Sequence, residues 1–197
     1  MYPGTFDGDI YQRRTRFIVA VVGAAFIALP AIAQSPGPHR PPKTDAEMIA
    51  NAMSAGPLAV SRDATIIAMD GDKMRTLRKG SNEFTCMPDD PGSPGNDPMC
   101  LDRNGMLWLQ AWMDHKDAPK GKMGLVYMLQ GGSDASNDDP FATAPPPGAK
   151  WVATGPHVMV VGMAGQLDGF TRSASNPAKP FVMWGGTSYE HIMMPVK

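Results

Sequence analysis

The sequence lacks the local motifs that identify a reaction. It contains no P-loop and no dinucleotide-binding Gly-x-Gly-x-x-Gly, and Gly131-Gly132 is too short to hold a phosphate group. It has no Gly-x-Ser-x-Gly elbow for a nucleophilic serine. Acidic and basic side chains nearly balance at a formal net charge of -1, which gives no electrostatic basis for binding nucleic acid or anionic lipid. These absences favour a binding or structural role over a specific enzyme class.

The first 33 residues have the pattern of a secretory signal peptide. Arginines at 13, 14 and 16 precede an apolar run at 17–29, and Pro30 and an Ala-x-Ala sequence follow. This order predicts cleavage near Ala33-Gln34 and a periplasmic or secreted product. An uncleaved anchor is the alternative, because residues 17–33 reach the short limit for crossing a bilayer. The arginine pair leaves both Sec and twin-arginine export open.

The exported part is expected to be one domain. Residues 34–43 are a Pro-rich linker, and residues 44–197 are long enough to form a single core. The leader holds three Arg and two Asp, so 15 of the 18 basic and 17 of the 19 acidic side chains remain, a net charge of -2. No later apolar run approaches membrane length, so no stable membrane insertion is expected after cleavage. The expected partner is a small ligand or another envelope protein.

Both cysteines lie in the exported part, where a disulfide can persist. Cys86 and Cys100 bracket a segment with mirrored ends, Cys-Met-Pro-Asp and Asp-Pro-Met-Cys. This symmetry predicts a loop with opposed arms closed by a disulfide, and its Pro and Gly residues argue against a helix or a central strand. The alternatives are a soft-metal site of Cys and Met sulfur atoms, or a calcium site at Asp89, Asp90 and Asp97.

The residue pattern predicts an α+β fold, with a mainly antiparallel sheet, one or two packed helices and long Pro/Gly/Asp-rich loops. Thr44 and Glu47 form a capping box that begins the first helix, and the second runs from Asp102 or Asn104 to near His115. From Leu58 the pattern becomes β-like, with a hairpin turn at Asp70-Gly71-Asp72. The expected strands are 64–69, 74–77, 83–87, 124–129, 151–154, 158–163, 181–184 and 192–196.

Histidine and methionine offer a metal-binding alternative. His157 and Met159 stand two residues apart, as do His191 and Met193, so each pair would share one face of a strand. If the two strands were neighbours, these four side chains and His115 would converge on one ion, with copper favoured by the thioether sulfur atoms. The competing interpretation needs no cofactor: the imidazoles are hydrogen-bonded structural residues and the methionines fill the core.

A hydrolase is the third possibility, because the polar loop at 130–150 contains Asp134, Ser136, Asp138 and Asp139. These are nucleophile and acid/base types, but no arrangement is specified, and aspartates before a proline often cap turns. The favoured hypothesis is a non-catalytic binding or structural module of the cell envelope. It predicts a concave apolar patch lined by Trp and Met without titratable pairs.

Overall fold

The structure is a computed structural model that describes residues 39–71, 73–176 and 178–196. The predicted signal peptide, its cleavage site and the first part of the linker lie outside these residues. The described helices and strands are α1 (Asp45–Ser54), α2 (Leu58–Ser61), β1 (Thr65–Asp70), β2 (Lys73–Arg78), β3 (Thr85–Met87), β4 (Met99–Leu101), α3 (Arg103–Met113), β5 (Gly124–Met128), β6 (Gly132–Asp134), β7 (Val152–Thr154), β8 (His157–Val161), β9 (Phe181–Met183) and β10 (His191–Pro195).

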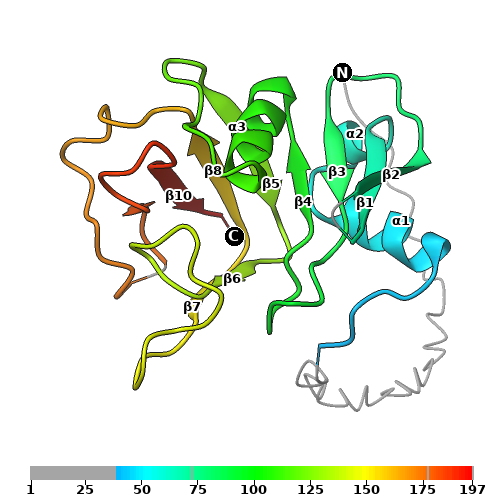
Figure 1. The fold of residues 1–197 in the computed structure, drawn as a ribbon. Coiled ribbons are helices and arrows are strands. Elements are labelled where there is room, and N and C mark those ends of the chain that lie inside the picture. Colours follow the sequence, from blue (N-terminus) through cyan, green and yellow to red (C-terminus); the bar gives the residue numbers. More distant parts are fainter. Residues whose placement is uncertain (1–38, 72, 177, 197) are drawn as a thin grey trace, which may run out of the picture. The chain divides into compact units, whose positions relative to one another are not determined.

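The described chain forms one compact unit, a mixed sheet of many strands with a few short helices (Figure 1). Eight strands follow the order β2-β1-β3-β4-β5-β8-β10-β9, and β6 and β7 form a separate pair. β1 and β3 are parallel, and the other pairings of the described strands are antiparallel. None of the described helices is long and apolar enough to cross a membrane.

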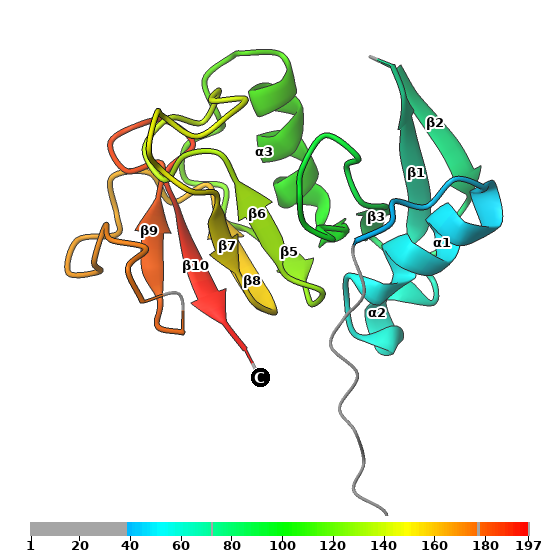
Figure 2. The ribbon, with the colours of Figure 1, turned by 90° about the horizontal axis from the view of Figure 1, so that it is seen from below.

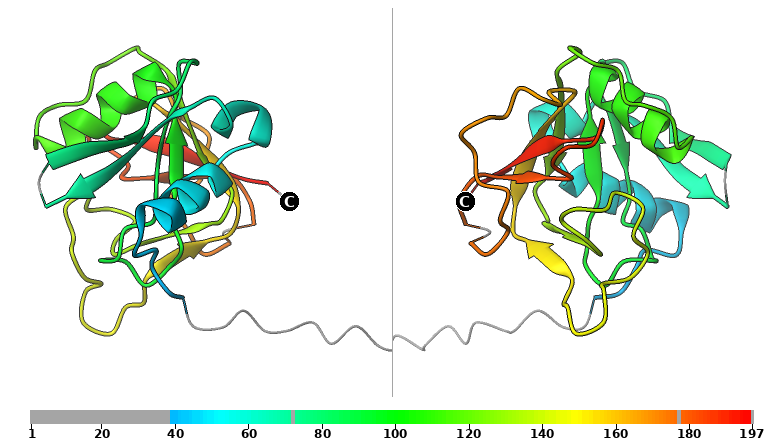
Figure 3. Two further views of the ribbon diagram at one scale, coloured as in Figure 1. Left: turned by 90° about the vertical axis from the view of Figure 1, so that its right-hand side faces the viewer. Right: turned by 60° about the vertical axis from the view of Figure 1, so that its left-hand side comes forward.

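The sheet has two faces that are covered by different elements. Ile66 and Cys86 point to the face of the sheet against which α1 packs. Figure 2 shows α1 beside β1 and β3. The neighbouring residues Ile67 and Met87 point to the other face, where α3 packs on β4 and β5 above the largest part of the core. Since successive strand residues alternate in direction, α1 and α3 lie on opposite faces of the sheet (Figure 3).

Both predicted helix starts are confirmed. The backbone N–H of Thr44 donates to Glu47 Oε2 at 2.9 Å, and the N–H of Glu47 donates to Thr44 Oγ1 at 3.2 Å, which completes the capping box. Asp102 caps α3 by accepting a hydrogen bond from the Gly105 N–H at 2.7 Å. The first residue beyond the C-cap of α3 is His115, whose left-handed φ of 53° ends the helix.

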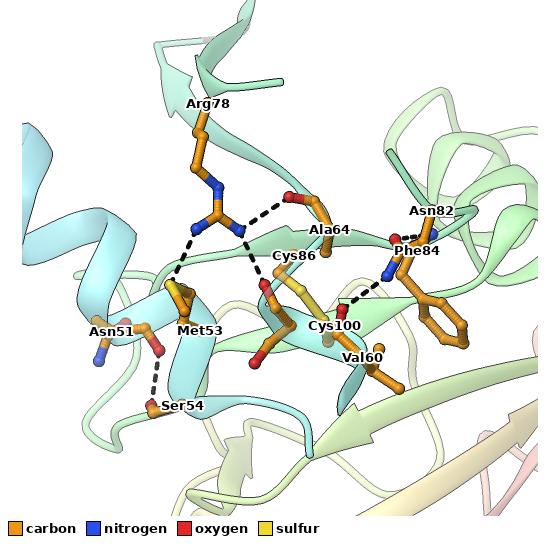
Figure 4. The surroundings of a disulfide bond; sticks show 11 residues. Asn51, Met53, Ser54, Val60, Ala64, Arg78, Asn82, Phe84, Cys86 and Cys100 are labelled. Carbon is orange, nitrogen blue, oxygen red and sulfur yellow. Dashed lines mark hydrogen bonds between the residues drawn. A yellow bond between two sulfur atoms is a disulfide. The ribbon is translucent and has the colours of Figure 1, made fainter. Parts of the chain in front are cut away.

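The predicted hairpin is confirmed, since β1 and β2 pair around Gly71, which has a φ of 59°. The β-like interpretation is wrong for residues 58–61, which form α2. The carbonyl of Pro57 accepts from the Val60 and Ser61 N–H groups. At the end of the helix Arg78 donates to Ser61 O at 2.8 Å, and it also donates to Ala64 O at 3.0 Å, as Figure 4 shows. This distant side chain satisfies a helix end that the local pattern does not reveal.

The predicted disulfide between Cys86 and Cys100 is confirmed, and it joins directly opposed residues of β3 and β4 (Figure 4). Met87 opposes Met99, and the N–H of Asp97 donates to Asp89 Oδ1 at 2.9 Å, so the mirrored arms lie side by side. The ends of the segment do form central strands, because its Pro and Gly residues lie only between the two methionines. With both sulfur atoms bonded, neither cysteine is a thiolate ligand for a soft metal.

Candidate functional site

A cavity of about 560 Å³ lies on the α3 face of the sheet, bounded by α3, the central strands and the loop at 135–151. Its apolar wall consists mainly of tryptophan and methionine side chains: Met99, Trp108, Trp112, Met128, Trp151, Met159, Trp184 and Met193. Its ionisable lining is mostly acidic: Asp90, Asp97, Asp134 and Asp139, with His115 and His191. No lysine or arginine of the described chain lines this cavity.

Three of these indoles stack in the order Trp108, Trp184, Trp112. The ring centroids are 5.8 and 6.3 Å apart, and the planes lie within 11° and 5° of parallel. Trp108 and Trp112 share a face of α3 because they are one turn apart. Trp184 follows β9 with a φ of 54°, which is uncommon for a bulky side chain. Because the Trp184 ring lies between Trp108 and Trp112, it joins the end of β9 to α3.

The 135–151 loop is attached to this stack by hydrogen bonds to its backbone. The N–H of Trp184 donates to Asn137 O at 2.7 Å, and Trp184 Nε1 donates to Ser136 O at 3.0 Å. Trp112 Nε1 donates to Pro140 O at 2.8 Å, and the rings of Phe141 and His115 stack with centroids 4.3 Å apart. These contacts hold the loop as one wall of the cavity.

Asp134, at the end of β6, is the least compensated charge in the site. The residue is half-buried and lines the cavity, and its carboxyl accepts no hydrogen bond from a described residue. Burial, with a smaller contribution from the charge of Asp97, raises the pKa of Asp134 to about 7. Both protonation states of this carboxyl are therefore populated near neutral pH.

Asp97 is a second carboxyl with a raised pKa. Burial and the neighbouring Asp89 raise the pKa of Asp97 to about 6, although the Ser93 hydroxyl donates to its Oδ2 and opposes the shift. Asp89, whose side chain is fully buried, contacts His39 Nε2 at 2.8 Å. His39 was not among the predicted site residues, because no local pattern reveals a contact across 50 positions. Asp89 neighbours Asp97, and Asp97 neighbours Asp134, so three adjacent carboxyls connect His39 to the cavity.

Comparisons of the chain with protein-family models, with curated proteins and with solved structures found no match. The function therefore has to be inferred from the chemistry of the cavity itself.

The predicted loop residues divide between the cavity and the surface. Asp134, Ser136 and Asp139 line the cavity, whereas Asp138 is exposed and does not. Ser136 Oγ accepts from the N–H groups of Asp138 and Asp139 at 3.1 and 3.0 Å, which is a turn-capping role. Within the described chain, no histidine hydrogen bonds to Ser133 or Ser136, so neither hydroxyl has the adjacent histidine base that a serine nucleophile requires.

The pairing of Asp134 with Asp97 was missed because it depends on a close tertiary approach. β6 packs against the loop between the cysteines: an added Cβ at Gly95 would lie 2.6 Å from Ser133 Oγ, and one at Gly132 would lie 3.7 Å from Asp97 Cβ. The Pro/Gly-rich composition of that loop, with acidic residues at its mirrored ends, was the only sequence signal that pointed toward this region.

The predicted metal residues come together only in part. β8 and β10 are neighbours, and Met159 directly opposes Met193. His157 opposes Pro195, four residues beyond His191, so the two histidines share a face and their backbone positions are offset by about 13 Å along the strands. His115 is exposed at the end of α3. The structure therefore brings the two methionines directly opposite each other, whereas the two histidines lie out of register on their strands.

Each of these two strand histidines is held as a neutral ring. His157 Nδ1 hydrogen bonds to Gly155 O at 2.8 Å, and His191 Nδ1 to Tyr189 O at 2.9 Å. Burial lowers the pKa of both imidazoles, that of His191 to about 4. Both Nε2 atoms are buried and have no hydrogen-bond partner in the described part of the chain.

The carboxylates of Asp89 and Asp90, two residues of the alternative calcium site, are engaged in hydrogen bonds within the chain. Asp89 contacts His39 and the Asp97 N–H, and Asp90 Oδ1 accepts from the Gly92 N–H at 2.8 Å. Among the described residues, no group of three or more His, Cys, Asp or Glu side chains is placed to hold a metal ion. Metal binding, including copper at Met159 and Met193, remains a prediction.

Proposed function

We propose that this chain is a small-molecule-binding module of the cell envelope and that its ligand occupies the cavity beneath the 135–151 loop. The cavity itself carries the proposal. Its volume of about 560 Å³ lies within the range of ligand sites, and an apolar Trp and Met wall with a few polar groups is their usual lining. The envelope location rests on the predicted signal peptide.

Unpartnered polar atoms in the lining residues support a ligand with polar groups as well as an apolar body. Trp108 Nε1, Ser133 Oγ and His191 Nε2 are buried and have no hydrogen-bond partner among the described residues. Each such atom costs about 1–3 kcal/mol. The carboxyls of Asp97 and Asp134 add an acidic element that the sequence-based hypothesis of a purely apolar patch did not include.

The proposal is tested with N-phenyl-1-naphthylamine, a neutral probe that fluoresces in apolar sites. We expect saturable fluorescence with the purified exported chain. Ala142→Trp introduces a bulky ring at the cavity wall and should abolish the signal. The matched control is Ala144→Trp, which places the same ring at an exposed position of the same loop that does not line the cavity. Equal binding by both variants would place the probe outside the cavity and contradict the proposal.

One observation favours a second function, an acid/base hydrolase. Asp97 and Asp134 lie in one cavity, and burial raises their pKa values to about 6 and about 7; a carboxyl with a raised pKa can serve as the general acid in glycoside hydrolysis when a second carboxyl is nearby. A panel of 4-nitrophenyl glycosides tests this function. Turnover that is lost in Asp134→Asn and kept in Asp138→Asn would support the hydrolase.

A further inference from the structure

We propose that the ligand is an organic cation: an amine whose ammonium group pairs with the Asp134 carboxylate and whose apolar body lies against the tryptophan and methionine wall. This inference rests on the proposed function, because it names the ligand class of the same cavity. It is based on the charge of the lining, on the hydrogen bonds of its carboxyls and on the placement of its aromatic rings.

The charge of the lining is acidic and uncompensated. Four aspartates line the cavity, and no lysine or arginine of the described residues does. His191 is neutral at pH 7, because burial lowers its pKa to about 4. An anionic ligand would be repelled by this lining, and a neutral ligand would leave the carboxyls desolvated without a counter-charge.

Asp134 is the carboxyl that lacks donors. Asp97 accepts hydrogen bonds from the Ser93 hydroxyl and, at 3.3 Å, from the Asp90 N–H. Asp139 Oδ1 accepts from the Phe141 N–H at 2.9 Å. Asp134 receives no hydrogen bond from the described chain, so an ammonium in the cavity would supply both the charge and the donors that it lacks.

The aromatic wall suits the rest of a cationic ligand. Trp108, Trp112, Trp151 and Trp184 all line the same cavity as Asp134. Indole side chains present a large apolar surface against which hydrocarbon groups pack. An amine attached to an aromatic or branched hydrocarbon therefore matches both parts of the lining.

Binding of such a cation should strengthen as the pH rises through 7, because Asp134 is then increasingly ionised. The other ionisable groups facing the cavity are Asp90, Asp97, Asp139 and His115, with His191. Asp97, with a pKa near 6, also becomes ionised as the pH rises, and this too should strengthen cation binding. The low pKa of His191 keeps its ring neutral between pH 5.5 and 8.

The test is displacement of bound N-phenyl-1-naphthylamine by 2-phenylethylamine and by its uncharged analogue 2-phenylethanol at pH 7.5. We expect the amine to bind at least about tenfold more tightly than the alcohol, a difference of about 1.4 kcal/mol. Asp134→Asn should remove this preference while the probe still binds. Asp138→Asn removes a nearby exposed carboxylate outside the cavity and should leave the preference unchanged.

The outcomes separate the two proposals. If the probe does not bind the wild-type chain, the proposed function fails. If the probe binds and the alcohol competes as well as the amine, the cavity binds ligands but the cation inference is wrong. A preference that survives in Asp134→Asn overturns the assignment to Asp134. Should Asp134→Asn unfold, Asp134→Glu replaces it, because it keeps the charge. In Asp134→Glu, a preference for the amine that is present at pH 7.5 and absent at pH 5.5 supports the inference. The absence of this preference at both pH values contradicts the inference.

Discussion

The indole of Trp184 stacks on that of Trp108, with ring centroids 5.8 Å apart and planes 11° from parallel. The pair connects the end of β9 to α3 at the wall of the cavity, and Trp184 also hydrogen bonds to the 135–151 loop. Trp184 thus contacts two of the elements that surround the proposed ligand site, α3 and the 135–151 loop.

Trp184→Ala should lower the free energy of unfolding by about 3–5 kcal/mol, because it removes a large buried aromatic side chain. Urea denaturation measures this loss. Trp151→Ala is the control, since Trp151 also lines the cavity but is only half-buried, and it should cost distinctly less. Equal losses in the two variants would show that the stack is not a main source of stability.

Reduction of the Cys86–Cys100 disulfide should lower the free energy of unfolding by about 3 kcal/mol, as chain entropy predicts for a loop of this length. The measurement is urea denaturation with and without a phosphine reductant. A Cys86→Ser, Cys100→Ser double variant should match the reduced protein and be unaffected by the reductant. An unchanged midpoint for protein shown by mass to be reduced would contradict the prediction.

Asp134 should make the protein less stable as the pH rises from about 4 to 7. Its folded pKa near 7 lies above the ordinary value of 3.8, so the folded state holds a proton that the unfolded state has released. This contribution is complete below about pH 4 and is lost as the pH passes through 7. Thermal melts should therefore show the stability of wild type relative to Asp134→Asn falling over that interval.

Other carboxyls change stability in the opposite direction with pH. Hydrogen bonds lower the pKa values of Asp45, Glu47 and Asp114, but these groups are common to both proteins and cancel in the difference. Asp138→Asn, which removes an exposed carboxylate from the adjoining loop, is the matched control and is compared with wild type in the same way. A flat difference for Asp134→Asn over this interval would show that its pKa is not raised by folding.

Glu190 should matter more for stability than its ionic partner Arg172. The carboxylate is buried and accepts from the Gly186 and Gly165 N–H groups at 2.7 and 3.0 Å and from Arg172 Nη2 at 3.1 Å. Glu190→Ala leaves those backbone donors unpaired and should cost about 1–3 kcal/mol in urea denaturation.

The matched variant is Arg172→Ala. The arginine side chain is 58% exposed, and exposed partners of this kind typically contribute about 1 kcal/mol or less. A larger loss for Arg172→Ala than for Glu190→Ala would mean that the ion pair, and not the backbone hydrogen bonds, determines the role of Glu190.

Much of the local structure follows from residues close together in the chain. The capping box at Thr44, the cap at Asp102 and the turn at Gly71 were predicted because each depends on a few adjacent positions. The disulfide was predictable as well, because mirrored residues on two arms fall opposite each other once the loop turns back. The short helix α2 was not, because its end is satisfied by Arg78 from a later strand.

The site was less predictable than the elements that carry it. The sequence by itself determined which chemical groups the chain possesses and which pairs share a strand or helix face, as with Trp108 and Trp112, because strand and helix periodicity act over a few residues. Only the tertiary structure decided that Asp97 lies near Asp134, that Trp184 enters the indole stack, and that His157 opposes Pro195 and not His191. These relationships depend on strand register and on the packing of long loops, which are set by contacts among residues far apart in the chain.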